Sequence, residues 1–151
     1  MSTVSAATRI AAPVEKVWGL LDDFRRMPEY VHFVREVFDY TEPPVGVGSR
    51  YSERSKPGPV ESVSHWVVTQ VEPLRRQVHE TKMPDIEAVL TVSMEPDGEG
   101  GTRYAQSTEF RLLPKARPIG WLLETLVMRR RMQAHMEKIV ANVKRISEAE
   151  T

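Results

Sequence analysis

The chain contains no cysteine, which excludes disulfide bonds, thiolate nucleophiles, cysteine-ligated zinc and iron–sulfur clusters. It also has no excess of either charge, because 21 Lys and Arg balance 21 Asp and Glu among its 151 residues. A neutral chain argues against a protein that binds nucleic acid through many phosphate contacts. The composition therefore makes nucleic acid a poor first candidate for the partner.

Long apolar segments are absent as well. The longest apolar run, residues 119–128, is interrupted by Glu124 and is far shorter than the ~20 residues needed to cross a bilayer. The first ten residues lack the basic start and the apolar core of a signal peptide. We expect a soluble, cytoplasmic protein with one domain over residues 1–151 and a frayed polar tail at residues 148–151.

The catalytic motifs of common enzyme classes are missing. There is no Gly-x-Ser-x-Gly and no phosphate-binding glycine loop, and Gly98, Gly100 and Gly101 suit a hairpin turn. The chain has four histidines: His32, His65, His79 and His135. None of them has a second His or a carboxylate at the spacing of a metal site. We therefore expect no metal site and no cofactor.

The pattern of apolar residues predicts the order of elements. Alternation over residues 4–11 predicts a strand, and Pro13 begins a short amphipathic helix that ends at Asp22, followed by further helical turns around Pro28. Six strand-like runs separated by Pro and Gly turns then predict an antiparallel meander: residues 34–41, 48–56, 60–72, 76–83, 87–95 and 102–113. One face of the clearest run is polar, so we expect the sheet to be covered on one side.

A helix of about 29 residues, from Pro118 to Ser147, should provide that cover. Its apolar stripe comprises Trp121, Thr125, Met128, Met132, Met136, Ile139, Val140, Val143 and Ile146. Leu123, Leu126 and Val127 fall outside the stripe. They could contact loops, a lid or a second subunit, so a homodimer through them is one possibility.

This order of elements, an α+β arrangement, resembles the helix-grip fold, in which a curved antiparallel sheet of about seven strands wraps a C-terminal helix. The resemblance is carried by residues 10–18 (IAAPVEKVW), 21–24 (LDDF), 27–30 (MPEY), 46–50 (GVGSR), 71–73 (VEP) and 101–103 (GTR). These residues resemble the START-like superfamily, and within it the polyketide cyclase/dehydrase and lipid-transport branch. The resemblance implies the fold and a lipophilic ligand, and it carries no catalytic signature.

A sheet bent around a helix leaves an apolar internal cavity, and flexible Met side chains suit guests of different shapes, although Met also fills uneven cores. We predict that the ligand contacts inward-facing residues of two strands and the helix. They are Tyr104, Gln106, Thr108, Phe110, Leu90, Val92, Trp121, Thr125, Met128, Arg129, Met132 and Met136.

Two residues are candidates for chemistry. We favour the register in which His65 faces inward together with Val63, Val67, Thr69 and Val71, where it would be a general base or a structural histidine. The opposite register would bury Trp66 and Val68 instead. Arg129 lies at the edge of the helix stripe, where its guanidinium group could bind a carboxylate or enolate oxygen at the pocket mouth, or simply lie on the surface.

Three functions remain open. The first is a carrier or sensor that encloses a small lipophilic molecule, with affinity from apolar burial. The second is an enzyme similar to the polyketide cyclases, which folds a poly-keto chain for aldol closure or dehydration. The third is a module that binds a protein partner through Leu123, Leu126 and Val127.

Overall fold

The computed structural model describes residues 2–113 and 118–150. A single seven-stranded sheet holds the fold together, with strand order β1-β7-β6-β5-β4-β3-β2 and every neighbouring pair antiparallel. The strands are β1 (Ser2–Ile10), β2 (Val34–Phe38), β3 (Arg50–Ser55), β4 (Ser62–Glu72), β5 (Arg76–Lys82), β6 (Ile86–Pro96) and β7 (Thr102–Leu112). The predicted meander of six strands is confirmed, and β1 adds to its far edge.

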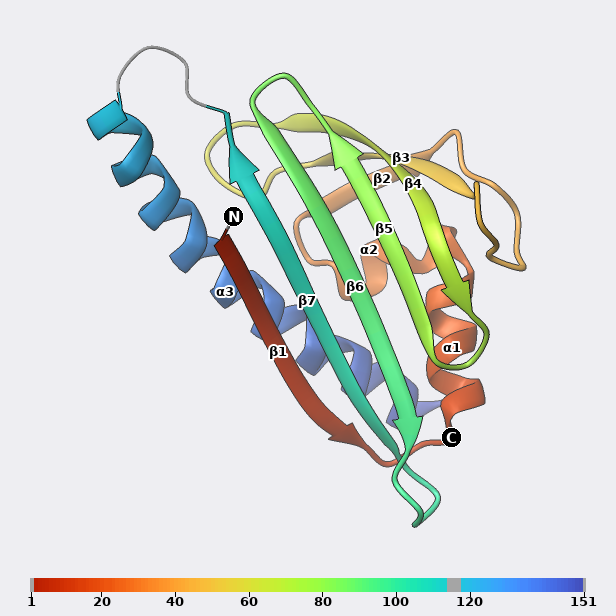
Figure 1. Cartoon of the computed structure of the whole chain (residues 1–151). Helices are drawn as coiled ribbons and strands as arrows, with labels where there is room; N and C mark the ends of the chain where they lie inside the picture. The colour runs from red at the N-terminus through yellow and green to blue at the C-terminus, as the bar shows by residue number, and fades with distance from the viewer. Residues whose placement is uncertain (1, 114–117, 151) are drawn as a thin grey trace.

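Helices cover one face of this sheet. Figure 1 shows α3 (Pro118–Ala149) running behind β1 and β7, while α1 (Val14–Asp22) and α2 (Met27–Tyr30) lie behind the same face, towards the opposite edge of the sheet. A short 3-10 helix, η1 (Phe24–Arg26), joins α1 to α2. This is the predicted helix-grip arrangement, with an open sheet around a long C-terminal helix.

Local sequence explains the first helix. Pro13 stands immediately before α1 with an extended backbone, and Val14, Val17, Leu20 and Leu21 form its buried side. These positions recur at spacings of three and four, so they share one face of the helix. That face packs into the larger apolar core together with α3.

The predicted stripe of α3 faces the sheet, but its two halves differ. In the C-terminal half Met136, Ile139, Val140, Val143 and Ile146 are all buried. In the N-terminal half every stripe residue is only half-buried: Trp121, Thr125, Met128 and Met132. Figure 1 shows why, because the first turns of α3 extend past the start of β1. The helix is therefore packed at one end and open at the other.

Residues 148–150 differ from the prediction of a frayed tail at residues 148–151, and residue 151 lies outside the described residues. Helix α3 continues to Ala149, and the Glu148 carboxylate accepts hydrogen bonds from the Ala11 backbone N–H at 2.7 Å and from Lys144 Nζ at 2.8 Å. Glu150 pairs with Arg26. Polar composition suggested fraying, but these contacts with the start of the fold hold residues 148–150.

Cross-strand register decides which side chains face the helices. Trp66 lies opposite Thr81, Thr81 opposite Ala88, and Ala88 opposite Phe110, so these four point to the same face. Phe110 is fully buried there and packs with Met136 of the helix. This face is therefore the inner face, and the neighbouring residues along each strand point outward.

Within residues 2–113 and 118–150, no helix has the length and hydropathy required to span a membrane.

Candidate functional site

The inner face of the sheet is covered least near the N-terminal half of α3. A second apolar cluster, separate from the main core, is formed there by buried Val4, Ala88, Phe110 and Met136. Besides Ala6, six larger inward-facing apolar side chains pack on it and are only half-buried: Trp66, Ile86, Leu90, Leu112, Met128 and Met132. We call these six residues the open end. Apolar side chains that face the core and still meet solvent are unusual in a closed interior, so this surface is available to a ligand.

The edges of the open end are held by contacts to α3. At one edge, Trp121 Nε1 donates a hydrogen bond to the Leu112 carbonyl oxygen at 2.5 Å. At the other edge, His135 Nε2 donates to the Pro57 carbonyl oxygen at 2.8 Å, which ties the β3–β4 connection to the helix. His135 Nδ1 then accepts from His32 Nε2 at 2.8 Å. The Trp121 contact thus attaches the start of the half-buried part of α3 to β7, and the His135 contact attaches its end to the β3–β4 connection.

The structure separates the predicted ligand residues into two groups. Leu90, Trp121, Thr125, Met128 and Met132 are half-buried at or beside the open end. The others, apart from Arg129, face inward as predicted but are buried: Tyr104, Gln106, Thr108, Phe110, Val92 and Met136. Of these, Tyr104 and Val92 belong to the main core. These buried residues pack beneath the open end and contribute little to its solvent-exposed surface.

The inward orientation of His65 was wrong. His65 lies opposite Ser52, and both point to the outer face, where Ser52 Oγ and His65 Nδ1 are 2.6 Å apart. The alternative register, with Trp66 and Val68 inward, is the observed one. A hydrophobic alternation fits both registers of this strand, and the pairing with β5 and its bulge near Thr69 decides between them.

The predicted role of Arg129 at the pocket mouth remains a prediction. Arg129 is exposed, and no residue within the described ranges forms an ion pair with it. The apolar residues that the stripe excluded are exposed as well, at 63% for Leu123, 58% for Leu126 and 48% for Val127, and Leu122 joins them at 56%. The helix wheel predicted this second apolar side without predicting what covers it.

Sequence reasoning missed a chain of buried polar side chains beneath the open end. The Tyr51 hydroxyl lies 2.8 Å from His79 Nδ1, and His79 Nε2 lies 2.8 Å from Gln77 Oε1. Because Gln77 Oε1 can only accept, His79 carries its proton on Nε2 and accepts from Tyr51 at Nδ1. Burial lowers the pKa of His79 to about 4, so its ring is neutral. Gln77 Nε2 is buried and has no hydrogen-bond partner in the described part of the chain.

Glu53 is the second feature that was missed. It lies opposite Ser64 on the inner face and is 9% exposed. Trp66 Nε1 donates to Ser64 Oγ at 3.0 Å, and Ser64 Oγ donates to Glu53 Oε1 at 3.2 Å. Burial raises the pKa of Glu53 to about 7, although these hydrogen bonds oppose the shift. The signal in the sequence was weak: Tyr51, Glu53 and Ser55 alternate with outward residues, but a charged residue at an inward position argues against that register.

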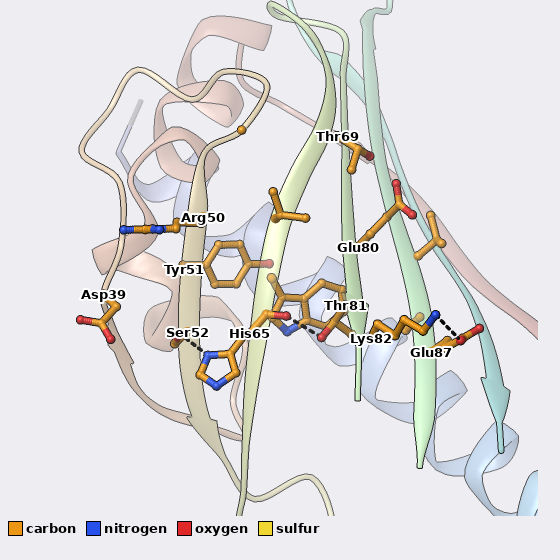
Figure 2. Close-up of a pocket in the computed structure, with 15 residues that line it drawn as sticks. Asp39, Arg50, Tyr51, Ser52, His65, Thr69, Glu80, Thr81, Lys82 and Glu87 are labelled. Carbon is orange, nitrogen blue, oxygen red and sulfur yellow. Dashed lines mark hydrogen bonds and ion pairs between the residues drawn. The ribbon is translucent and has the colours of Figure 1, made fainter. Parts of the chain in front are cut away.

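The two hollows described in the structure both lie on the outer face, so neither of them is the internal cavity that the sequence predicted. The larger has a volume of about 1120 Å³ and is lined by outward residues of β3 to β6. Figure 2 shows the Ser52–His65 contact and the Lys82–Glu87 ion pair in it, with Arg50 and Glu80 nearby. The smaller lies over β1, β6 and β7. The charged lining of the larger hollow is a poor match for the lipophilic ligand that the resemblance implies.

Metal chemistry finds no support in residues 2–113 and 118–150, because no group of three or more His, Asp or Glu side chains is placed to hold an ion.

With this geometry established, comparison with protein families identifies the chain. Residues 1–148 match the model of the family described as polyketide cyclase / dehydrase and lipid transport. The chain belongs to this family. The polyketide cyclase/dehydrase and lipid-transport branch that the sequence resembled is therefore confirmed.

Solved structures agree with the fold. The chain resembles TTHA0849 from Thermus thermophilus, with 22% identity, a TM-score of 0.79 and coverage of 99% of both chains. It resembles the ZhuI aromatase/cyclase from Streptomyces sp. R1128, with 14% identity, a TM-score of 0.76 and coverage of 99% of this chain and 97% of that one.

A START superfamily protein from Mycobacterium smegmatis has 14% identity and a TM-score of 0.67, with 95% of this chain and 98% of that chain covered. No curated protein matches. At these identities the structures establish the fold, and the family establishes a ligand-binding or cyclase role in general terms.

Proposed function

We propose that this protein binds a small lipophilic molecule between the inner face of the sheet and the N-terminal half of α3, as a carrier or sensor. The observation that carries the proposal is the open end, where six inward-facing apolar side chains are only half-buried. Covering them with an apolar ligand gains roughly 25 cal/mol for each Å² removed from water.

The side chains at this position suit a ligand of variable shape. Met128 and Met132 are unbranched and polarizable, so they can repack around different guests. Trp66 offers a flat surface for a ring, and its indole N–H is already bonded to Ser64. These residues supply the apolar contacts, while the buried polar side chains below them supply a small number of orienting groups.

The test uses the neutral apolar dye N-phenyl-1-naphthylamine, whose fluorescence rises in an apolar site. We expect the wild-type protein to bind it, and M132W, which fills the open end, to bind it at least about tenfold more weakly. The matched control is V67W, because Val67 is 41% exposed and lines the outer hollow. V67W should bind like the wild type, and melting curves should show that both variants are folded.

Each other outcome has a clear meaning. Loss of binding in V67W but not in M132W would move the site to the outer hollow. Absence of binding to the wild type, after native mass spectrometry has shown that the protein carries no lipophile from its source, would overturn the proposal. The cyclase alternative is decided separately, by incubating the protein with a poly-keto surrogate and analysing the products: conversion would replace the carrier role by catalysis.

A further inference from the structure

Four large aliphatic side chains near the start of α3 are exposed to solvent: Leu122, Leu123, Leu126 and Val127. Spacings of three and four residues make them neighbours on the helix surface, beside the stripe that faces the sheet. We call these four residues the projecting face. Figure 1 shows why it is exposed, because the first turns of α3 extend past the start of β1.

The side of α3 that carries Leu126 is covered by β1 further along the helix. Gln133 Oε1 accepts a hydrogen bond from the Ser5 backbone N–H at 3.2 Å, and Gln133 Nε2 donates to the Ser5 carbonyl oxygen at 2.8 Å. Leu126 lies two turns earlier on nearly the same side, about 11 Å along the helix axis. The projecting face therefore belongs to a helix that the sheet holds in place.

Positive charge borders the projecting face. Arg130 lies four residues after Leu126, so it continues the same side of the helix, and Arg129 and Arg131 point about 100° to either side of it. Arg129 and Arg130 are exposed, whereas Arg131 is half-buried with its guanidinium group against Gly58. None of these three arginines forms an ion pair within residues 2–113 and 118–150.

This combination of aliphatic and basic side chains fits a lipid surface that carries negative charge. Helices that lie on membranes place apolar side chains among the lipid headgroups and basic side chains near the phosphates. Arginine suits this position, because its stem packs on apolar surface while its guanidinium group bonds to phosphate oxygens. Residues 118–136 contain three arginines and one acidic residue, Glu124, although the whole chain has no net charge. The local charge therefore complements anionic lipid.

A protein partner fits the same surface less well. Stable protein interfaces use roughly 20–30 residues on each side, which is far more than the projecting face and its arginines supply. A partner that binds a helix in a groove surrounds much of it, but Met128 and Met132 of this helix already pack on the sheet. What remains is a shallow contact with a broad surface, and a bilayer provides one.

We propose that the projecting face and the three arginines beside it dock reversibly on an anionic lipid surface. The binding of such helices depends on both apolar area and charge, so four aliphatic side chains need the arginines as well. Docking goes beyond the proposed function and gives the open end a source of ligand. Met128 of the open end directly follows Val127, so docking brings the open end to the bilayer surface.

Sedimentation of the full chain with lipid vesicles tests the proposal. One set of vesicles is pure phosphatidylcholine, which is zwitterionic, and the other also contains the anionic phosphatidylglycerol. We expect the wild type to bind the anionic vesicles at least about tenfold more tightly than the zwitterionic ones. Raising the NaCl concentration from about 50 mM to about 500 mM should weaken this binding at least about fivefold, because salt screens exposed charges.

Two pairs of variants locate the basic contact. R129Q/R130Q should bind the anionic vesicles at least about tenfold more weakly than the wild type. The matched control is K138Q/R145Q, which removes two charges at exposed positions further along α3 and should bind within about twofold of the wild type.

Two more pairs locate the apolar contact. L123S/L126S should also weaken binding at least about tenfold. Its control is V47S/V67S, which changes aliphatic side chains that are exposed elsewhere, at 73% for Val47 and 41% for Val67, and should bind within about twofold of the wild type. Melting curves should show that all variants are folded.

Other outcomes would overturn the docking. Equal binding to both kinds of vesicle, or losses in the control pairs as large as in the test pairs, would do so. A wild type that binds no vesicles and sediments as a dimer, which L123S/L126S dissociates, would assign the projecting face to a second copy. Dye binding separates this proposal from the proposed function. Vesicle binding without dye binding refutes the ligand site alone, and dye binding without vesicle binding refutes the docking alone.

Discussion

The substitution E53Q should change how the stability of this protein depends on pH. Glu53 has an ordinary pKa of 4.5 and, because of burial, a pKa of about 7 in the folded protein. Between these values the folded state binds more protons than the unfolded state, so the free energy of unfolding falls as pH rises from about 4.5 to about 7. A glutamine at this position has no proton to lose, so the variant shows no such fall.

The magnitude follows from the two pKa values. At about 1.36 kcal/mol for each pH unit, the difference between 4.5 and about 7 corresponds to about 3 kcal/mol. We therefore expect the stability of E53Q relative to the wild type to be about 3 kcal/mol more favourable at pH 8 than at pH 4.5. Taking the difference between the two proteins removes the titration of His79, which both share.

The assay is urea unfolding monitored by circular dichroism at several pH values between 4.5 and 8. The matched control is E87Q on the outer face, where Arg111 lowers the pKa of Glu87, so the relative stability of this variant changes only below about pH 5 and should stay constant from about pH 5.5 to 8. A relative stability of E53Q that varies by less than about 1 kcal/mol over this range would refute the reasoning and place Glu53 in contact with water.

Three further predictions concern other parts of the chain. The pKa of His79 is about 4 in the folded protein and 6.5 ordinarily, so the unfolded state binds more protons between these pH values. In E53Q, where the titration of Glu53 is absent, the free energy of unfolding should therefore fall by about 3 kcal/mol as pH falls from about 7 to 4, measured by urea unfolding. Met136→Ala should cost about 3 kcal/mol and Met128→Ala less than about 1 kcal/mol, because only Met136 is buried; equal costs would show that α3 is packed along its whole length. Leu126→Glu should change the free energy of unfolding by less than about 0.5 kcal/mol, because Leu126 is exposed. If the sedimentation coefficient depends on concentration in the wild type but not in this variant, the protein associates with itself through this side of α3.

The local patterns predicted the elements well because each pattern has one structural solution. Alternation in residues 87–95 and 102–113 defines one buried face whatever the neighbouring strands are, and both strands appear where expected. The stripe along α3 was predicted residue by residue for the same reason, since helical spacing places Met128, Met132 and Met136 on one side.

The candidate site was predicted less well, because it depends on contacts between strands that are distant along the chain. Residues 62–72 alternate equally well in either register, so the orientation of His65 and Trp66 required the pairing with β3 and β5. Glu53 became a candidate only when Ser64 and Trp66 were placed beside it with no cation among the described residues. A sequence does not show the solvation of a carboxyl group, which is a property of the folded surroundings.

The sequence alone determined the order of the elements, the inner faces of the last two strands and the apolar stripe of the terminal helix. These follow from periodicity, which each segment carries in itself. Only the tertiary structure decided that α3 leaves its N-terminal half incompletely packed, that Trp66 faces inward, and that Glu53 is buried. Packing, register and burial depend on contacts between residues that are distant along the chain, so they cannot be predicted from any single segment.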